Sequence, residues 1–112
     1  MGARVHFLKA SVADVAGLLG FLSTEDPGTA ERFERALETA VRRLETFPRI
    51  GHPVRSRNPR IHGIRSWPVP GFPAILLFYR ADRESVFVVR VLHGARDLPG
   101  ELGGETLRAE EE

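Results

Sequence analysis

Two apolar runs joined by a short polar turn, in the third quarter of the chain, constrain the fold more than any other feature. Residues 74–80 read Ala-Ile-Leu-Leu-Phe-Tyr-Arg, and residues 86–92 read Val-Phe-Val-Val-Arg-Val-Leu. Asp82, Arg83 and Glu84 lie between them. β-Branched and aromatic residues favour strands, and a few polar residues between two such runs favour a hairpin turn. The sequence therefore predicts a β-hairpin whose two strands are both largely buried.

A strand and a helix are predicted near the N-terminus. Residues 4–9 alternate polar and apolar side chains, which is typical of a strand. Ser11 followed by Asp14 has the spacing of a short capping box, in which the side chains satisfy backbone N–H groups at a helix start. Apolar residues then recur at helical spacing as far as about Ser23. We expect a first helix capped by Ser11.

A second helix is predicted directly after the first. Asp26 followed by Pro27 is a strong helix start, because an acidic residue caps free N–H groups and proline suits the first helical position. Apolar residues keep helical phase as far as Phe47, and Pro48 and Gly51 stop the pattern. Two helices joined by about three residues form an antiparallel hairpin whose apolar stripes need cover.

The remaining elements complete an α+β fold. Residues 49–63 show little periodicity and contain proline, glycine, asparagine and arginine, so we expect a loop. Residues 64–69 form the second strand, and the prolines and glycine at 68–73 predict an irregular link to the third. The expected order is β-α-α-β-β-β, with a helical hairpin packed on a small, mostly antiparallel sheet.

Length and composition limit the class of protein. The 112 residues suit one domain, which we assign to residues 1–98, with an acidic, flexible tail over residues 99–112. The chain has no cysteine, and its four histidines lack the spacing of metal ligands. No stretch approaches the roughly 18 apolar residues of a membrane span. We expect a cytoplasmic protein without a cofactor, a metal or a membrane partner.

Positive charge is concentrated in the predicted loop. Seven basic residues without an acid lie in this loop and the first residues of the strand after it: Arg49, His52, Arg55, Arg57, Arg60, His62 and Arg65. Uncompensated guanidinium groups repel one another unless a negative group is near. The run therefore favours contact with nucleic-acid phosphates or with an acidic protein, although a solvated surface is the ordinary alternative.

Three polar residues follow the second strand of the hairpin: His93, Arg96 and Asp97. Polar side chains at the end of a core strand are typical of a functional site or a partner-docking corner. Each also has a structural interpretation, in which His93 bonds the backbone and the other two anchor the last strand. Arg65 and Trp67 likewise suit either a surface cation–π contact or stacking on a target base.

The order of these pieces resembles the RelE/ParE superfamily of small bacterial toxins. The resemblance is carried by the ending Val-Val-Arg-Val-Leu-His-Gly-Ala-Arg-Asp after Phe-Tyr-Arg and a turn. Three earlier pieces fit it: the apolar helix through Phe33 and Leu37, Leu-Glu-Thr-Phe-Pro-Arg-Ile-Gly at 44–51, and Ile-Arg-Ser-Trp at 64–67. Together they span residues 5–98, and the His-Gly-Ala-Arg-Asp ending is similar to the ParE branch.

The resemblance implies the toxin of a type II toxin–antitoxin system. Such a ParE-like toxin would arrest growth by binding DNA gyrase, and a cognate antitoxin, ParD-like or other, would neutralise it by folding over it. The alternative is a RelE-like, ribosome-dependent mRNA endoribonuclease. Its lysines, expected before the second strand, are replaced here by arginines. A third possibility is a binding protein that has kept the scaffold and lost its target.

The resemblance also implies two sets of site residues. Target contact falls on the polar residues of the sheet: Arg65, Trp67, Arg80, His93, Arg96 and Asp97. The nuclease alternative would use four of them in catalysis: Arg65, Arg80, His93 and Arg96. The antitoxin would cover an exposed apolar stripe of the helical hairpin: Leu18, Leu22, Phe33, Leu37 and Val41.

Overall fold

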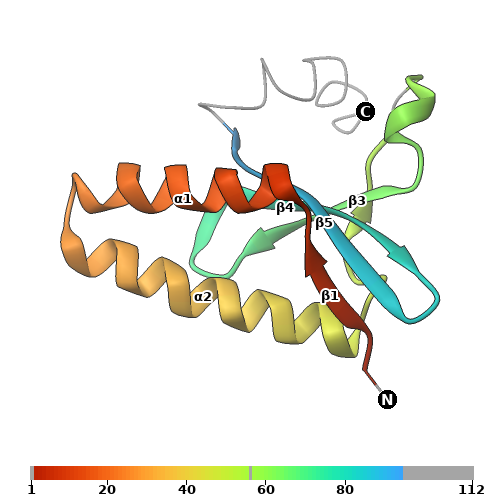
Figure 1. Cartoon of the computed structure of the whole chain (residues 1–112), viewed down its shortest axis with the longest axis horizontal. Helices are drawn as coiled ribbons and strands as arrows, with labels where there is room; N and C mark the ends of the chain where they lie inside the picture. The colour runs from red at the N-terminus through yellow and green to blue at the C-terminus, as the bar shows by residue number, and fades with distance from the viewer. Residues whose placement is uncertain (1, 56, 95–112) are drawn as a thin grey trace.

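The structure, a computed structural model, describes residues 2–55 and 57–94. Its elements in chain order are β1 (Arg4–Phe7), α1 (Lys9–Ser23), α2 (Pro27–Thr46), β2 (His52–Pro53), a 3-10 helix η1 (Pro59–Ile61), β3 (Ile64–Val69), β4 (Phe72–Asp82) and β5 (Ser85–His93). The two helices lie side by side against one face of the sheet (Figure 1). Arg96, Asp97 and the predicted tail lie outside the described residues.

The sheet has five strands in the order β1-β5-β4-β3-β2. Neighbours pair antiparallel except β1, which lies parallel to β5 at one edge. The predicted α+β class, the mostly antiparallel sheet and the hairpin of β4 and β5 are confirmed. The segment predicted as a plain loop contains two additional elements, β2 and η1. β2 escaped prediction because two paired residues have no periodicity to detect.

Two apolar clusters hold the layers together. The larger fills the space between helices and sheet, and Phe33 of α2 sits at its centre, fully buried and edge-on to Phe72 with ring centroids 5.5 Å apart. The smaller cluster lies on the opposite face, under the segment that contains η1. Its buried members are Val54, Ile61, Ile64, Phe78 and Leu92. The sheet is therefore covered on both faces, by helices on one side and by a loop on the other.

The two helix starts differ in how well the sequence predicts them. Asp26 caps α2 as expected, accepting a hydrogen bond from the Gly28 N–H at 3.1 Å, and Pro27 is the first helical residue. The capping box at Ser11 is wrong. α1 already begins at Lys9, and the buried Ser11 hydroxyl donates back to the Leu8 carbonyl at 2.7 Å. The local pattern misleads because the Asp14 side chain bonds Arg90 and Val91 of β5 and not the start of its own helix.

The apolar stripe predicted to receive an antitoxin is mostly internal. Leu18, Leu22 and Phe33 are buried in the large cluster, so their predicted exposure is wrong. Helical periodicity identifies a face that needs cover, and here the sheet supplies that cover. Leu37 and Val41 are only half-buried and remain at the rim of the core.

Neither α1 nor α2 combines the length and apolar character that crossing a bilayer requires.

Candidate functional site

Arg65 holds the chain that leaves α2. It lies on β3 opposite Tyr79, on the face that the helices cover. Its Nη1 donates to the carbonyl oxygens of Gly51 at 2.8 Å and Arg49 at 3.1 Å. A guanidinium that spans two carbonyls fixes the direction of the backbone after the helix. The structure thus gives Arg65 a structural contact, whether or not it also meets a target.

Tyr79 fixes the same segment from beneath. Its hydroxyl oxygen accepts a hydrogen bond from the Gly51 N–H at 2.8 Å. A Cβ at Gly51 would lie 2.7 Å from that oxygen and 2.8 Å from the Ser66 carbonyl oxygen, so only glycine fits. Burial raises the pKa of the Tyr79 hydroxyl, while the Gly51 bond and the Arg65 charge partly oppose that rise.

Arg80 plays a comparable part on the other face of the sheet. It is the register partner of Ile64, which belongs to the loop-covered cluster. Its Nη1 donates to the His62 carbonyl oxygen at 2.6 Å and so ties the end of the loop to β4. Arg65 and Arg80 are therefore close along the sheet but lie on opposite faces.

His93 and Trp67 lie on the helix-covered face at the far end of the sheet. His93 is the register partner of Ile75, and its ring meets the edge of Phe21 of α1 with centroids 6.3 Å apart. Trp67 is half-buried against the large cluster, and its buried indole Nε1 makes no hydrogen bond within the residues described. Both side chains are parts of the helix–sheet contact.

The predicted catalytic set does not converge in the described residues. Arg80 and His93 lie on different faces. Arg80 is five positions along β4 from Ile75, the register partner of His93, which is about 16 Å at strand spacing. General acid–base cleavage needs its groups within hydrogen-bond reach of one phosphate. Arg65, Arg80 and His93 therefore do not form a nuclease site together. Arg96, the fourth predicted member, lies outside the described residues.

The basic loop keeps its expected exposure. Arg49, His52, Arg55, Arg57 and His62 all have exposed side chains. No acid occurs from Thr46 to Ala81, because Glu45 and Asp82 are the nearest carboxylates in the sequence. No cluster of three or more histidine or carboxylate side chains that could hold a metal ion forms in the residues described.

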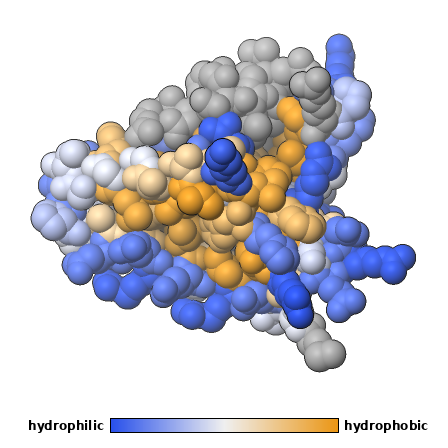
Figure 2. All heavy atoms as spheres, in the orientation of Figure 1, coloured by the Kyte–Doolittle hydropathy of each residue, from blue (hydrophilic) through white to orange (hydrophobic). Residues whose placement is uncertain are grey.

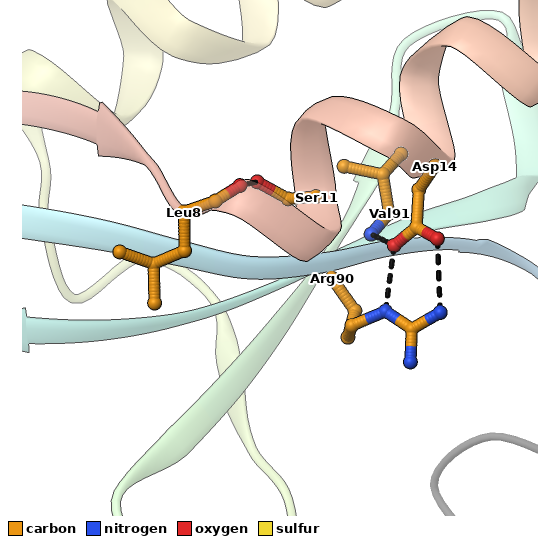
Figure 3. A network of polar contacts seen from close by, with 5 residues as sticks. All are labelled: Leu8, Ser11, Asp14, Arg90 and Val91. Carbon is orange, nitrogen blue, oxygen red and sulfur yellow. Dashed lines mark hydrogen bonds and ion pairs between the residues drawn. The ribbon is translucent and has the colours of Figure 1, made fainter.

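Sequence reasoning missed the contact that attaches α1 to the free edge of β5 (Figure 3). The Asp14 carboxylate accepts from Arg90 Nε at 2.7 Å and Nη2 at 2.9 Å, and from the Val91 N–H at 3.0 Å. One carboxylate thus satisfies a strand edge N–H and a guanidinium beside it. The partners are about 76 residues apart in sequence, so no local signal could have identified them.

A second missed contact joins the first and last strands. The His6 ring stacks on Phe87 with centroids 5.2 Å apart and planes 20° apart. Parallel pairing of β1 with β5 places the two residues in register, and Arg80 is the partner of Phe87 on the next strand. His6, Phe87 and Arg80 thus form a row across three strands, on the face opposite the helices. An alternating pattern in residues 4–9 predicted the strand but not its partner.

Comparison with known proteins connects this architecture to a family. A family model described as "ParE toxin of type II toxin-antitoxin system, parDE" matches residues 5–98. Toxin ParE3 of Caulobacter vibrioides is 33% identical over 70 residues, which cover 62% of this chain and 64% of that protein. The chain thus matches somewhat under two thirds of the length of this relative.

A solved structure has the same fold. The structure described as "Chromosomal ParDE TA system from P. aeruginosa" superposes with a TM-score of 0.65, over 81% of this chain and 95% of that one. Its sequence is 14% identical, so the likeness concerns the arrangement of helices and strands. It agrees with a helical hairpin packed on one face of a small sheet.

Proposed function

The chain belongs to the ParE toxin family of type II toxin–antitoxin systems, and we propose that it arrests growth by binding DNA gyrase. The observation that carries the proposal is the dispersal of Arg65, Arg80 and His93 over two faces of the sheet. Their contacts hold the fold together, and within the described residues these three side chains do not meet at one site for a ribose and its phosphate. A toxin of this kind acts by stabilising one state of its target rather than by changing a substrate.

Purified gyrase tests this proposal directly. We expect the chain to inhibit supercoiling and to accumulate cleaved DNA complexes, while brief induction in cells creates no new RNA ends. Fresh cuts inside translated codons, with gyrase unaffected, would instead establish a RelE-like endoribonuclease. Normal growth and normal gyrase activity would identify a scaffold without this target.

Arg96 is the residue that we assign to target contact. Arg96→Ala should relieve growth arrest and leave both the thermal unfolding of the protein and antitoxin binding unchanged. Arg65→Ala is the matched comparison, because Arg65 bonds two backbone carbonyls and its loss should lower the midpoint of unfolding. Undiminished toxicity of Arg96→Ala would remove Arg96 from the site.

We further propose that a cognate antitoxin neutralises the protein at the groove between β1 and α2, together with the apolar side chains at the start of α1. A hollow of about 490 Å³ lies beside α2, with Phe7, Leu37 and Val41 as its apolar wall. Leu8 follows Phe7 directly and Val12 lies one turn further along α1, and these two side chains are exposed by 42% and 55%. Figure 2 shows apolar side chains gathered over the space between the helices. An apolar groove of this kind suits an amphipathic segment that folds on binding.

Charge insertion at this groove tests the antitoxin site. Val12→Glu should weaken co-purification of the antitoxin at least tenfold, because a carboxylate would replace exposed apolar surface. Ala13→Glu is the matched control, since Ala13 is exposed and points about 100° away from Val12 around the same helix. Equal binding by the two variants would place the antitoxin elsewhere. The product of a short neighbouring reading frame is the natural probe.

A further inference from the structure

We infer that the arginine surface, defined as Arg49, Arg55 and Arg57 with His52, binds the phosphate backbone of nucleic acid directly. These side chains are exposed on the segment that follows α2 and leads to η1. In the part of the chain that the structure describes, the three arginines make no ion pair. The inference goes beyond the gyrase proposal, because this contact needs no other protein.

The shape of the surface favours a linear polyanion. Residues 49–55 run beside β3, with His52 paired to Ser66 and the Val54 N–H bonded to the Ile64 carbonyl oxygen at 2.8 Å. The exposed cations of the arginine surface, from Arg49 to Arg57, thus follow one another over at most about 26 Å, at strand spacing. A nucleic-acid strand presents a phosphate at each step, so a row of cations can follow it. Guanidinium groups also match phosphate geometry through paired N–H donors.

The frame beneath these side chains is fixed. Val54 and Ile61 are 6% exposed and anchor the segment in the loop-covered cluster. Arg65 holds the Gly51 carbonyl and Arg80 holds the His62 carbonyl, one at each end of the segment. A ligand therefore meets cations on an ordered backbone, which lowers the entropy cost of binding.

The surroundings favour nucleic acid over an acidic protein. Protein interfaces usually centre on buried aromatic or aliphatic side chains. The large hydrophobic side chains that are exposed in the described residues are Leu8, Val12, Phe21 and Phe47. Phe47 lies two residues before Arg49 and lines a hollow of about 560 Å³ with it. None of the four lies between Pro48 and Ala81, where acids are also absent. Beyond Arg49, the surface over His52, Arg55 and Arg57 thus offers charge without an exposed large apolar side chain in the described residues, which is typical of backbone recognition in nucleic acids.

Fluorescence anisotropy with the full chain and a short labelled DNA duplex tests the inference without gyrase. Three phosphate contacts predict that affinity falls roughly 40-fold between 50 and 200 mM salt. The double variant Arg55→Glu/Arg57→Glu should bind at least tenfold more weakly and show only about one third of the salt slope. Single-stranded RNA of equal length, measured in parallel, decides which backbone binds more tightly.

The matched control is Arg32→Glu/Arg35→Glu, which makes the same charge change at exposed positions of α2. It should retain binding within about twofold. Equal losses of DNA affinity in the two double variants would mean that only the net charge of the protein matters, and this result would overturn the proposed site. Absence of DNA binding at 50 mM salt would overturn the inference too. So would poly-glutamate that binds with the same affinity as DNA and displaces it. Gyrase inhibition is measured separately, so either proposal can fail while the other stands.

Discussion

The two faces of the sheet have covers that differ in size, attachment and surface chemistry. The helical hairpin buries a cluster that includes Phe33 and Leu44, both fully inaccessible. The loop segment covers the other face with a few aliphatic residues, and Arg80 of β4 bonds its His62 carbonyl oxygen on that face. The helical side displays apolar groups at its rim, whereas the loop side displays arginines. One face therefore supplies most of the stability, and each presents a different chemistry to partners.

Removing the side chain at the centre of the helix-side cluster should have the largest effect on the free energy of unfolding. Phe33→Ala should lower the free energy of unfolding by about 3–5 kcal/mol, because it empties a fully buried site against Phe72. Chemical denaturation followed by circular dichroism measures this loss. Glu34→Ala, at an exposed neighbour, should change stability by less than about 0.5 kcal/mol. A loss below about 1 kcal/mol for Phe33→Ala would show that the helices contribute little.

Truncating a side chain in the loop-covered cluster should lower the free energy of unfolding by a smaller amount. Ile61→Ala should cost about 2 kcal/mol, the low end for such truncations, because Ile61 lies on a three-residue 3-10 helix that can move into the space. The same denaturation experiment measures it, with the exposed Arg57→Ala as control. A cost equal to that of Phe33→Ala would remove the proposed difference between the faces.

Polar contacts attach α1 to β5, and weakening them should lower the free energy of unfolding by an intermediate amount. Asp14→Asn should cost about 1–2 kcal/mol, because Arg90 loses its charged partner while the Val91 N–H can keep an oxygen acceptor. A double-mutant cycle with Arg90→Gln isolates the pair, and Asp82→Asn serves as an exposed control. Additive effects in that cycle would mean that the ion pair contributes nothing measurable.

The smallest effect concerns the Tyr79 hydroxyl beneath the loop attachment. Tyr79 is the sole tyrosine, so phenolate absorbance reports its ionisation directly. Burial raises its pKa above the ordinary 10.0, so the native midpoint should exceed that value and return to it in urea. The unfolded chain then ionises first, and stability should fall as pH rises from about 10 towards the native pKa.

Tyr79→Phe should remove this alkaline dependence and cost about 1 kcal/mol at neutral pH, since the Gly51 N–H loses its acceptor. Denaturation curves at neutral and alkaline pH measure both effects. An unchanged pH dependence in Tyr79→Phe would assign the alkaline loss to other groups.

The sequence predicted the elements whose signals are local. β3 occupies residues 64–69 as expected, because punctuation by Gly63 and Pro70 limits it on both sides. The start of α2 is correct because its cap, Asp26, bonds a neighbour two residues away. The hairpin of β4 and β5 is correct because two apolar runs flank a short polar turn. In each case the determining contact lies within a few residues.

The failures concern contacts between distant segments. Asp14 suits a capping box by spacing, yet its partners are Arg90 and Val91 on the last strand. Leu18 and Leu22 were expected at the surface because periodicity shows that a face is apolar but not what covers it. The contacts of Arg65 with the Arg49 and Gly51 carbonyls were likewise not predictable from sequence, and its role in target binding stays a prediction. Candidate site residues are harder to predict than strands because their roles depend on such partners.

The parallel pairing of β1 with β5 has a consequence for biosynthesis. β1 is translated before the other elements described, but it has no partner strand until β5 has been translated, after both helices, the loop, β3 and β4. Neither covered face of the sheet is complete before that moment. We therefore expect nascent chains of this protein to remain inert until β5 has been translated, with harmful activity appearing only once β5 has joined β1 to the rest of the sheet.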